Sequence, residues 1–259
     1  MWSAVGRDIL GEEALKRAKW FDVDTTCVFT VPDLPTGYVQ VKLSDTGDAR
    51  YTITQPVAWD AIAADNSHFP DFPVDAVVFG SLALRSESNQ NALRAYLDKF
   101  GKEAFVVIDV NLRPPFDDLD LVNRWIPYAN LVKVNEEEAE RLLDRTVKSE
   151  NLGLALAEKL QKNICLTRAA DGAEVVIDGT RIAVPGERVK VKSTVGAGDA
   201  FLARLLVEWL FSKGNITAKE LRNAVQLAGF VTASDGAVPP YDANDFGTGD
   251  LPSDAASGD

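Results

Sequence analysis

Two glycines and one carboxylate lie where the pattern of this chain changes. Residues 193–201, STVGAGDAF, follow the basic, β-branched run RVKVK and precede the apolar stretch FLARLLVEWLF, which is typical of a helix. Glycine lets a backbone turn sharply and approach a ligand closely, and the N–H groups at a helix N-terminus attract anions. Asp199 then has two interpretations. It complements the helix dipole, or it accepts a proton from a hydroxyl that attacks a phosphorus atom.

Polar residues also follow three shorter apolar runs. Arg113 follows VVIDV and carries a planar fork suited to phosphate oxygens, or else pairs with a surface acid. Asn135 and Glu138 follow LVKV at the spacing of a capping box; alternatively they hold water around Mg²⁺. Thr167 ends the run ICLT, and a glycine-bearing turn follows it. Each signal has an ordinary structural explanation when taken alone.

The remaining pattern predicts a frame that brings these residues to one edge. Apolar runs at 74–84, 104–110, 130–135 and 164–167 predict buried strands, and helical segments such as 86–101 separate them. This alternation favours an α/β fold with a mostly parallel sheet flanked by helices on both faces. In such sheets ligands bind beyond the carboxyl ends of the strands. The Walker pattern GxxxxGK[ST] is absent, so the chain is not a P-loop enzyme.

Only the early hairpin lies outside this alternation. GYVQVKL and ARYTIT around the turn SDTGD predict a β-hairpin over 37–54, a small lid or subdomain. A second hairpin is expected around Asp178-Gly179, and two helices over about 198–212 and 217–234. Residues 1–26 are expected to form a loop and then an amphipathic helix. The acidic, Gly/Ser-rich tail 242–259 is predicted to be disordered.

Composition excludes several classes of function. The 259 residues carry a formal net charge of −12, which disfavours nucleic-acid binding. There is no apolar run of membrane-spanning length and no signal-peptide pattern, so a cytoplasmic protein is expected. Cys27 and Cys165 lie in apolar runs and are expected to be buried, reduced thiols. His68 is the only histidine, which makes a zinc site improbable, and a serine triad would have to use this loop residue.

In combination, these motifs resemble the ribokinase-like (PfkB) carbohydrate kinases. STVGAGDAF resembles the family's D-T-x-G-A-G-D signature, DVNLRPP its D-x-N-x-R segment, NEEE its N-x-x-E motif and TRAADGA its T-x-G-x-x-G loop. AVGRDILGEEAL and DLPTGYVQVKL are similar to segments before and within its lid. The motifs follow one another in the family's order, and the resemblance covers about residues 4–241. We therefore expect residues 1–241 to form one kinase domain. The fructokinase branch is the most similar, from FGSLAL and DVNLRPP.

The resemblance implies transfer of the ATP γ-phosphate to a sugar hydroxyl in the presence of Mg²⁺. It implies that Asp199 is the general base and that the Gly-Ala-Gly amides form an anion hole. That anion hole comprises Gly196, Ala197 and Gly198. The resemblance further implies that Arg113 lies near the transferring phosphate, and that Asn135 and Glu138 organise Mg²⁺ and phosphate, with Glu138 acting through water. Thr167, Gly172 and Thr194 are implied to lie beside the nucleotide. The lid of such kinases often pairs with that of a partner, so a homodimer through the hairpin is expected.

The chain also departs from the family pattern. Family members begin with a central strand that carries a sugar-binding aspartate, then a Gly-Gly-x-x-x-Asn segment; this sequence begins after both. We therefore expect a sheet that lacks a central strand, in a chain truncated relative to the family or in a degenerate member. Ser193 stands for the first Asp of the signature, Ala169 for a usual glycine, and Arg204 for a usual small residue.

Two functions from different classes remain. The first is an ATP-dependent carbohydrate kinase, most consistent with a fructokinase; a ribokinase or nucleoside kinase is a variant within the same class. The second is a non-catalytic, sugar-kinase-like scaffold or regulatory subunit that has lost its substrate site. The absent start and Ser193 favour the second function. Retention of Asp199, Asn135, Glu138 and Arg113 favours the first.

Overall fold

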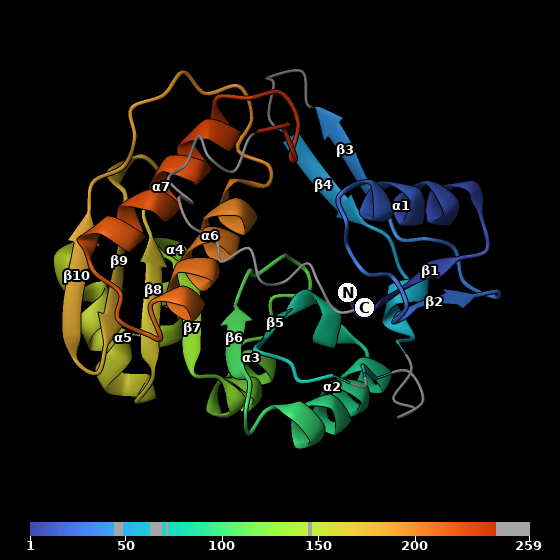
Figure 1. The fold of residues 1–259 in the computed structure, drawn as a ribbon, viewed down its shortest axis with the longest axis horizontal. Helices are drawn as coiled ribbons and strands as arrows, with labels where there is room; N and C mark the ends of the chain where they lie inside the picture. Colours follow the sequence, from blue (N-terminus) through green and yellow to red (C-terminus); the bar gives the residue numbers. More distant parts are fainter. Residues whose placement is uncertain (44–48, 63–68, 71, 145–146, 242–259) are drawn as a thin grey trace, which may run out of the picture. The chain divides into compact units, whose positions relative to one another are not determined.

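The computed structural model describes residues 1–43, 49–62, 69–70, 72–144 and 147–241. Its backbone divides into two compact units, Met1–Ala129 and Asn130–Asp259 (Figure 1). The tail 242–259 and His68 lie outside the described residues, and so does the tip of the predicted lid. Among the described residues, no helix combines the length and the apolar character needed to cross a bilayer.

The first unit contains three separate strand pairs. Its elements are β1 (Ser3–Gly6), α1 (Ile9–Trp20), β2 (Val28–Val31), β3 (Val39–Leu43), β4 (Ala49–Ile53), β5 (Ala76–Gly80), α2 (Glu87–Phe100), β6 (Phe105–Asp109) and α3 (Leu119–Trp125). β1 and β2 are parallel, as are β5 and β6, whereas β3 and β4 form the predicted antiparallel hairpin with Val39 opposite Ile53. The prediction of a loop before α1 was wrong, because the short run Ser3–Gly6 pairs with Val28–Val31 as β1 and β2.

The carboxylate of Asp8 joins α1 to the segment that leads into β3. It caps α1 by accepting a hydrogen bond of 2.8 Å from the backbone N–H of Gly11. It also accepts bonds from the backbone N–H and the hydroxyl of Thr36, at 2.8 and 2.6 Å. These bonds, the one from the Thr36 hydroxyl first, hold the pKa of Asp8 below its usual range. One ionised side chain thus fixes the base of the lid hairpin.

The second unit contains four neighbouring strands, in the order β10, β9, β8 and β7, with helices on both faces. Its elements are β7 (Leu131–Asn135), α4 (Glu136–Leu143), α5 (Leu152–Leu160), β8 (Asn163–Thr167), β9 (Ala173–Ile177), β10 (Thr180–Val184), α6 (Ala197–Phe211) and α7 (Ala218–Thr232). β7 and β8 are parallel, while β8, β9 and β10 are antiparallel neighbours. In Figure 1, α6 and α7 lie in front of these strands and α4 and α5 behind them. The interiors of β7, β8 and β9 are buried and mostly apolar, as continuous runs predict, whereas β10 is largely exposed.

Several local expectations change in the structure. The basic run 188–192 is not a strand; α6 is preceded by an irregular segment in which the N–H groups of Lys192 and Ser193 bond to the carbonyl of Thr232. The helical character of 136–160 is divided between α4 and α5, since Asp144 ends α4 in the left-handed conformation. Both cysteines are free, but Cys27 is only partly buried, because it lies in the turn before β2 rather than inside a strand.

Candidate active site

The glycine-rich segment 193–199 forms the N-terminus of α6. Gly196 is the N-cap residue with φ of 84°, a conformation that disfavours side chains. A Cβ at Gly196 would also overlap the carbonyl oxygen of Ala237. Asp199 occupies the first turn of α6 and is exposed. The sequence prediction of a sharp turn followed by a helix is therefore confirmed, and the glycine at 196 is required by two independent constraints.

The first turn of α6 presents N–H groups that the fold does not use. The N–H of Ala197 bonds to the carbonyl of Thr194 at 3.3 Å, whereas those of Gly198 and Asp199 make no hydrogen bond within the described residues. Ser193 accepts a bond from the N–H of Val195 at 3.2 Å, so it supports the turn without bringing a charge. Unused amides at the positive end of a 15-residue helix favour a bound anion.

Lys133 is a residue of this region that the sequence analysis missed. It lies inside β7, is 8% exposed, and places its Nζ atom 3.5 Å from the position a Cβ on Gly198 would take. An ammonium group therefore lies beside the first turn of α6. The signal was available, because Lys133 is the one charged residue in the apolar run LVKV. The ammonium group and the positive end of the helix both attract an anion.

Asn135 and Glu138 form the capping box that their spacing predicts. The Asn135 amide oxygen accepts from the N–H of Glu138, and the Glu138 carboxylate accepts from the N–H of Asn135, both at 2.9 Å. Asn135 is exposed at the end of β7, whereas Glu138 is buried. Because side chains alternate along a strand, Asn135 lies on the same face of β7 as Lys133. Capping is thus the observed role, and Mg²⁺ organisation stays a prediction.

Thr167 lies beside Asn135, since these two residues are register partners at the ends of β7 and β8. The turn after Thr167 ends at Gly172, where φ is 102° and a Cβ would overlap the carbonyl oxygen of Val184. Ala169, in the place of a usual glycine, has φ of 46°. The turn therefore adopts a shape that glycine would favour at both positions.

A buried carboxylate holds this turn to the sheet. Glu174 in β9 is 0% exposed and lies 3.1 Å from Arg168 and 2.5 Å from Arg181. It also accepts a bond of 3.1 Å from the N–H of Gly153. Arg168 in turn reaches Glu136 and the carbonyl of Ser149. Sequence patterns gave no indication of this cluster, because Glu174 interrupts a strand and its partners come from separate segments.

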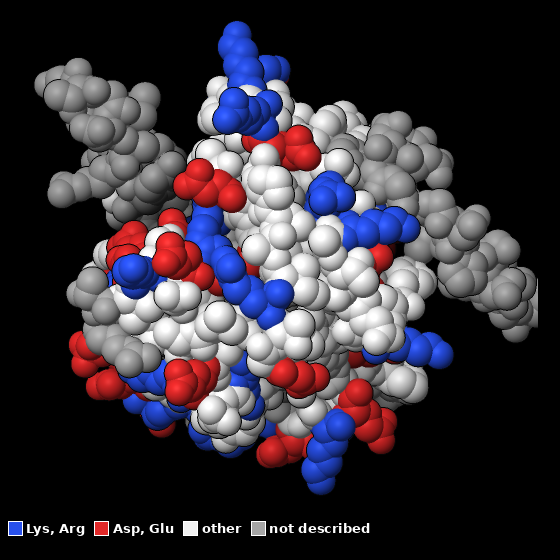
Figure 2. Space-filling view, turned by 90° about the vertical axis from the view of Figure 1, so that its left-hand side faces the viewer, with Lys and Arg blue, Asp and Glu red and all other residues white. Residues whose placement is uncertain are grey.

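The other predicted site residues have simpler surroundings. Arg113 belongs to the first unit, where it is exposed after β6 and bonds to the carbonyl of Leu112 at 3.3 Å. Its role beside a phosphate stays a prediction. Arg204 is buried on α6 and pairs with Glu208 at 2.6 Å, and Glu208 also accepts from Asn223 of α7. The departure at this position is thus accommodated by an ion pair within α6, whose carboxylate also accepts a hydrogen bond from α7. On the face drawn in Figure 2, basic and acidic side chains are interspersed.

The family model described as pfkB family carbohydrate kinase matches residues 1–244. This chain belongs to that family. Individual members of the pfkB family are similar to this chain over most of the chain's length. A fructokinase of Rhizobium leguminosarum bv. trifolii is 28% identical over 241 residues, which cover 86% of this chain and 71% of the relative.

Solved structures show the same fold. A fructokinase from Vibrio cholerae O395, solved with fructose, ADP and calcium, matches with a TM-score of 0.77 at 25% identity, over 91% of this chain and 80% of that one. An uncharacterized sugar kinase from Pyrococcus horikoshii in complex with ATP matches with a TM-score of 0.76 at 25% identity, over 91% and 77%. The ribokinase-like α/β fold and the carbohydrate kinase class, both expected from the motifs, are confirmed for this pfkB family chain.

Proposed function

We propose that this pfkB family kinase transfers the γ-phosphate of ATP to a hydroxyl of fructose, with Asp199 as the general base. The observation that carries the proposal is the N-terminus of α6. There a glycine with φ of 84°, two unused amides and an exposed carboxylate lie within four consecutive residues. Phosphoryl transfer depends mainly on positioning and on stabilisation of charge, and these groups supply both.

The proposed reaction is a single displacement at phosphorus. Asp199 accepts the proton of the sugar hydroxyl while its oxygen forms a bond to the γ-phosphorus. The bond from that phosphorus to the oxygen bridging the β-phosphate breaks, and ADP leaves with the electron pair. The products are a sugar phosphate, ADP and a proton, which Asp199 afterwards releases to solvent. A general base of this kind contributes roughly 10²–10⁴-fold in rate.

The proposed anion hole consists of the N–H groups of Gly196, Ala197 and Gly198, with Lys133 beside them. The N–H of Ala197 also makes a long bond of 3.3 Å to the carbonyl of Thr194, whereas that of Gly198 is unused within the described residues. Negative charge on the transferring phosphoryl oxygens is stabilised by the amides and by the positive end of α6. Lys133 lies next to Gly198 inside the unit, where a positive charge is weakly screened by solvent. This ammonium adds its attraction for a bound phosphate group to that of the amides.

ATP is proposed to lie along the turn from Thr167 to Gly172, with Thr194 on its other side. Asn135 and Glu138 offer the oxygen atoms that Mg²⁺ prefers, and because both side chains cap α4, they fit a hydrated ion held through water. Mg²⁺ supplies neutralisation of charge on the phosphates when it is bound. No group of three or more His, Cys, Asp and Glu that could hold a metal ion occurs among the described residues.

Fructose is proposed on the strength of the relatives. The Rhizobium relative and the Vibrio structure are both fructokinases, and the latter holds fructose and ADP. The motifs FGSLAL and DVNLRPP point to the same branch. Pairing of the lid hairpin with that of a second copy stays a prediction.

The test is ADP formation by the full chain with Mg-ATP and a panel of fructose, ribose, glucose and nucleosides. We expect release that depends on fructose, and a fall of about 10²–10⁴-fold in kcat for Asp199→Asn with an unchanged melting temperature. Asp235→Asn, which removes an exposed carboxylate paired with Lys192, is the matched control and should keep full activity.

Each result has a definite meaning. Release with another sugar would retain the kinase and replace fructose. Unchanged turnover in Asp199→Asn would remove this residue from the role of base. A folded protein that releases no ADP with any acceptor would favour the non-catalytic scaffold.

A further inference from the structure

The second unit contains a polar pocket beside the turn that joins β8 to β9. Its volume is about 450 Å³, which is within the range of pockets that hold small molecules. Charged side chains from three segments line it, since Glu150 precedes α5, Asp171 belongs to the turn and Arg181 lies in β10. This space is named the Arg181 pocket below.

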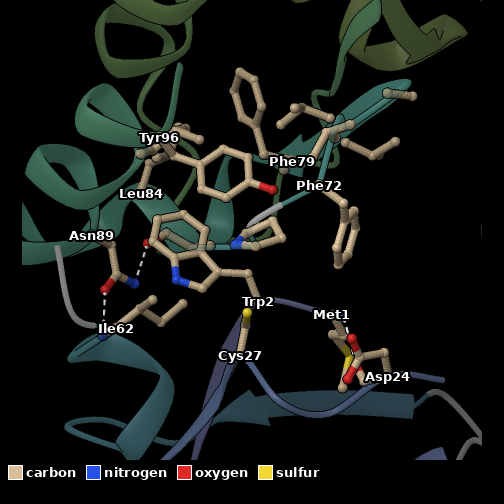
Figure 3. A pocket seen from close by; sticks show the side chains of 18 residues that line it. Met1, Trp2, Asp24, Cys27, Ile62, Phe72, Phe79, Leu84, Asn89 and Tyr96 are labelled. Carbon is tan, nitrogen blue, oxygen red and sulfur yellow. Dashed lines mark hydrogen bonds between the residues drawn. The ribbon is translucent and has the colours of Figure 1, made fainter. Parts of the chain in front are cut away.

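The Arg181 pocket differs in chemistry from the largest cavity of the first unit. That cavity lies along β5, has a volume of about 530 Å³, and is walled in part by the stacked rings of Trp2 and Tyr96 (Figure 3). Among its described lining residues, Asp24 is the one with a charged side chain, and this carboxylate accepts hydrogen bonds from Thr26. A charged ligand therefore finds unused side-chain charges in the Arg181 pocket, as shown next, rather than along β5.

Arg181 lies on the face of the strands that α5 covers. Its register partner is Val176, and Val176 lies two residues from Glu174 on the same strand, so the three side chains share one face. Glu174 meets α5 on that face, because its carboxylate accepts a hydrogen bond from the N–H of Gly153. The guanidinium of Arg181 is thus held on the α5 side of the second unit.

The proposed phosphate site lies on the other face of the same strands. Lys133 is the register partner of Cys165, which in turn is the register partner of Val175. Val175 alternates with Glu174 along β9, so Lys133 points away from α5 and towards Gly198 in the first turn of α6. The Arg181 pocket is therefore separate from the groups that are proposed to bind phosphate.

Arg181 presents two unused nitrogens in a fixed position. Its Nε atom lies 2.5 Å from the carboxylate of Glu174, which is 0% exposed, so the guanidinium is anchored. Its Nη1 and Nη2 atoms make no hydrogen bond with any residue that the structure describes. Arg168, by contrast, uses all three of its nitrogens on neighbouring residues. The free fork of Arg181 matches the two oxygens of a carboxylate.

Two carboxylates of the same pocket are also unpaired. The side chains of Glu150 and Asp171 are exposed and make no hydrogen bond or ion pair in the part of the chain that is described. A simple anion bound to Arg181 would be repelled by these two carboxylates, and a simple cation would be repelled by Arg181. A ligand that carries one negative and one positive group avoids both penalties. The charges therefore select a dipolar ligand.

We propose that the Arg181 pocket binds a free α-amino acid with an apolar side chain. The carboxylate of the ligand binds the two unused nitrogens of Arg181, and its ammonium group is attracted by Glu150 and Asp171. Ala183 and Pro185 are exposed in the same pocket and provide apolar surface for the ligand's side chain.

The Arg181 pocket adjoins the turn that the proposed function assigns to ATP. Arg168 and Asp171 line the pocket, and the N–H of Asp171 closes the turn with a bond of 2.8 Å to the carbonyl of Arg168. A ligand that engages Asp171 restricts this turn, and a turn ordered beforehand binds ATP at a smaller entropic cost. We expect a fall of about fivefold in the KM for ATP with an unchanged kcat, a consequence that rests on the proposed function.

The test measures binding to the full chain by isothermal titration calorimetry, with L-leucine as the probe. Two analogues of leucine are the controls, since 4-methylpentanoate lacks the ammonium group and 3-methylbutylamine lacks the carboxylate. We expect leucine to bind about tenfold or more tightly than either analogue, because each analogue loses one charge-assisted contact. Hydrogen exchange at residues 168–172 should slow as leucine is added, which reports the ordering of the turn.

Matched variants locate the binding. Arg181→Gln removes the free fork and should weaken leucine binding about tenfold or more. Arg222→Gln removes an exposed arginine of α7, outside the pocket, and should leave binding unchanged. The double variant Glu150→Gln and Asp171→Asn should weaken leucine binding but strengthen that of 4-methylpentanoate, because the repulsion of a lone carboxylate is removed. Both of these side chains are exposed, so the double variant keeps the test decisive if Arg181→Gln fails to fold.

Three outcomes would overturn the proposal. No binding up to high millimolar leucine would show that the pocket does not accept an amino acid. Equal binding of leucine and either analogue would show that it does not select a dipolar ligand. Leucine binding that is unchanged in Arg181→Gln and in the double variant would place the ligand elsewhere. Binding without a change in the KM for ATP would overturn the coupling alone, and the calorimetry needs no kinase activity, so it stands whether or not the proposed function holds.

Discussion

The strand ends of the second unit and the edge strand β5 of the first unit differ in how far neighbouring residues satisfy them. In Asn130–Asp259, the turns after β7 and β8 are fixed by a capping box and by the buried carboxylate of Glu174. In Met1–Ala129, β5 ends its strand pair beside a cavity of about 530 Å³. The turns of the second unit are held by bonds among its own residues. In the first unit, β5 pairs within the described residues only with β6, and Val78 on this strand is exposed.

The difference separates two kinds of requirement for a kinase. The proposed catalytic groups of the second unit require precise positions, and caps and ion pairs from the same unit surround them. The exposed apolar side chains beside β5 can be removed from water only by further apolar surface, which a single hydrogen bond does not supply.

The largest change in stability is expected from Glu174→Gln in the second unit. The substitution keeps the volume but removes the negative charge between Arg168 and Arg181, so it breaks a buried ion pair from one side. We expect the free energy of unfolding to fall by about 3 kcal/mol, measured by urea denaturation. Glu140→Gln, on the exposed side of α4, should change it little. A loss below about 1 kcal/mol would show that the turn does not depend on this carboxylate.

Features fixed by a few neighbouring residues could be predicted from the sequence, whereas features that depend on contacts between distant segments could not. The corner at Gly196, the capping box of Asn135 and Glu138, and the hairpins follow from residue type and spacing over a few positions. The strands β1 and β2 were missed, because each has four residues and acquires its structure only by pairing with the other. Lys133 and Glu174 required knowledge of which segments meet, and periodicity does not contain that information.

The second prediction concerns Asp8, which fixes the lid base in the first unit. Its pKa is lowered on folding, so its contribution to stability is present above the unfolded value, near 3.9, and is lost as the pH falls through the lower folded value. We expect Asp8→Asn to lower the melting temperature at pH 7, with the difference from the parent protein shrinking towards pH 2.5. Asp22→Asn, whose parent carboxylate makes no hydrogen bond within the described residues, is the control. An equal deficit at both pH values would show that the charge of Asp8 is not what fixes the lid.

The smallest change in stability is expected at Ala169, where the backbone of the second unit is strained. Its φ of 46° is unfavourable for alanine by roughly 1 kcal/mol, while glycine adds roughly half of that as unfolded-chain entropy. Ala169→Gly should therefore raise the free energy of unfolding by about 0.5 kcal/mol. Ala170→Gly, one residue on in the same turn and without a positive φ, brings only the entropic cost and should lower it. The opposite signs are the decisive feature, measured as shifts in the urea midpoint at constant slope. If both variants are destabilised, the turn after Thr167 tolerates alanine without strain. The departure from the family glycine would then have no energetic consequence for the frame of the nucleotide turn.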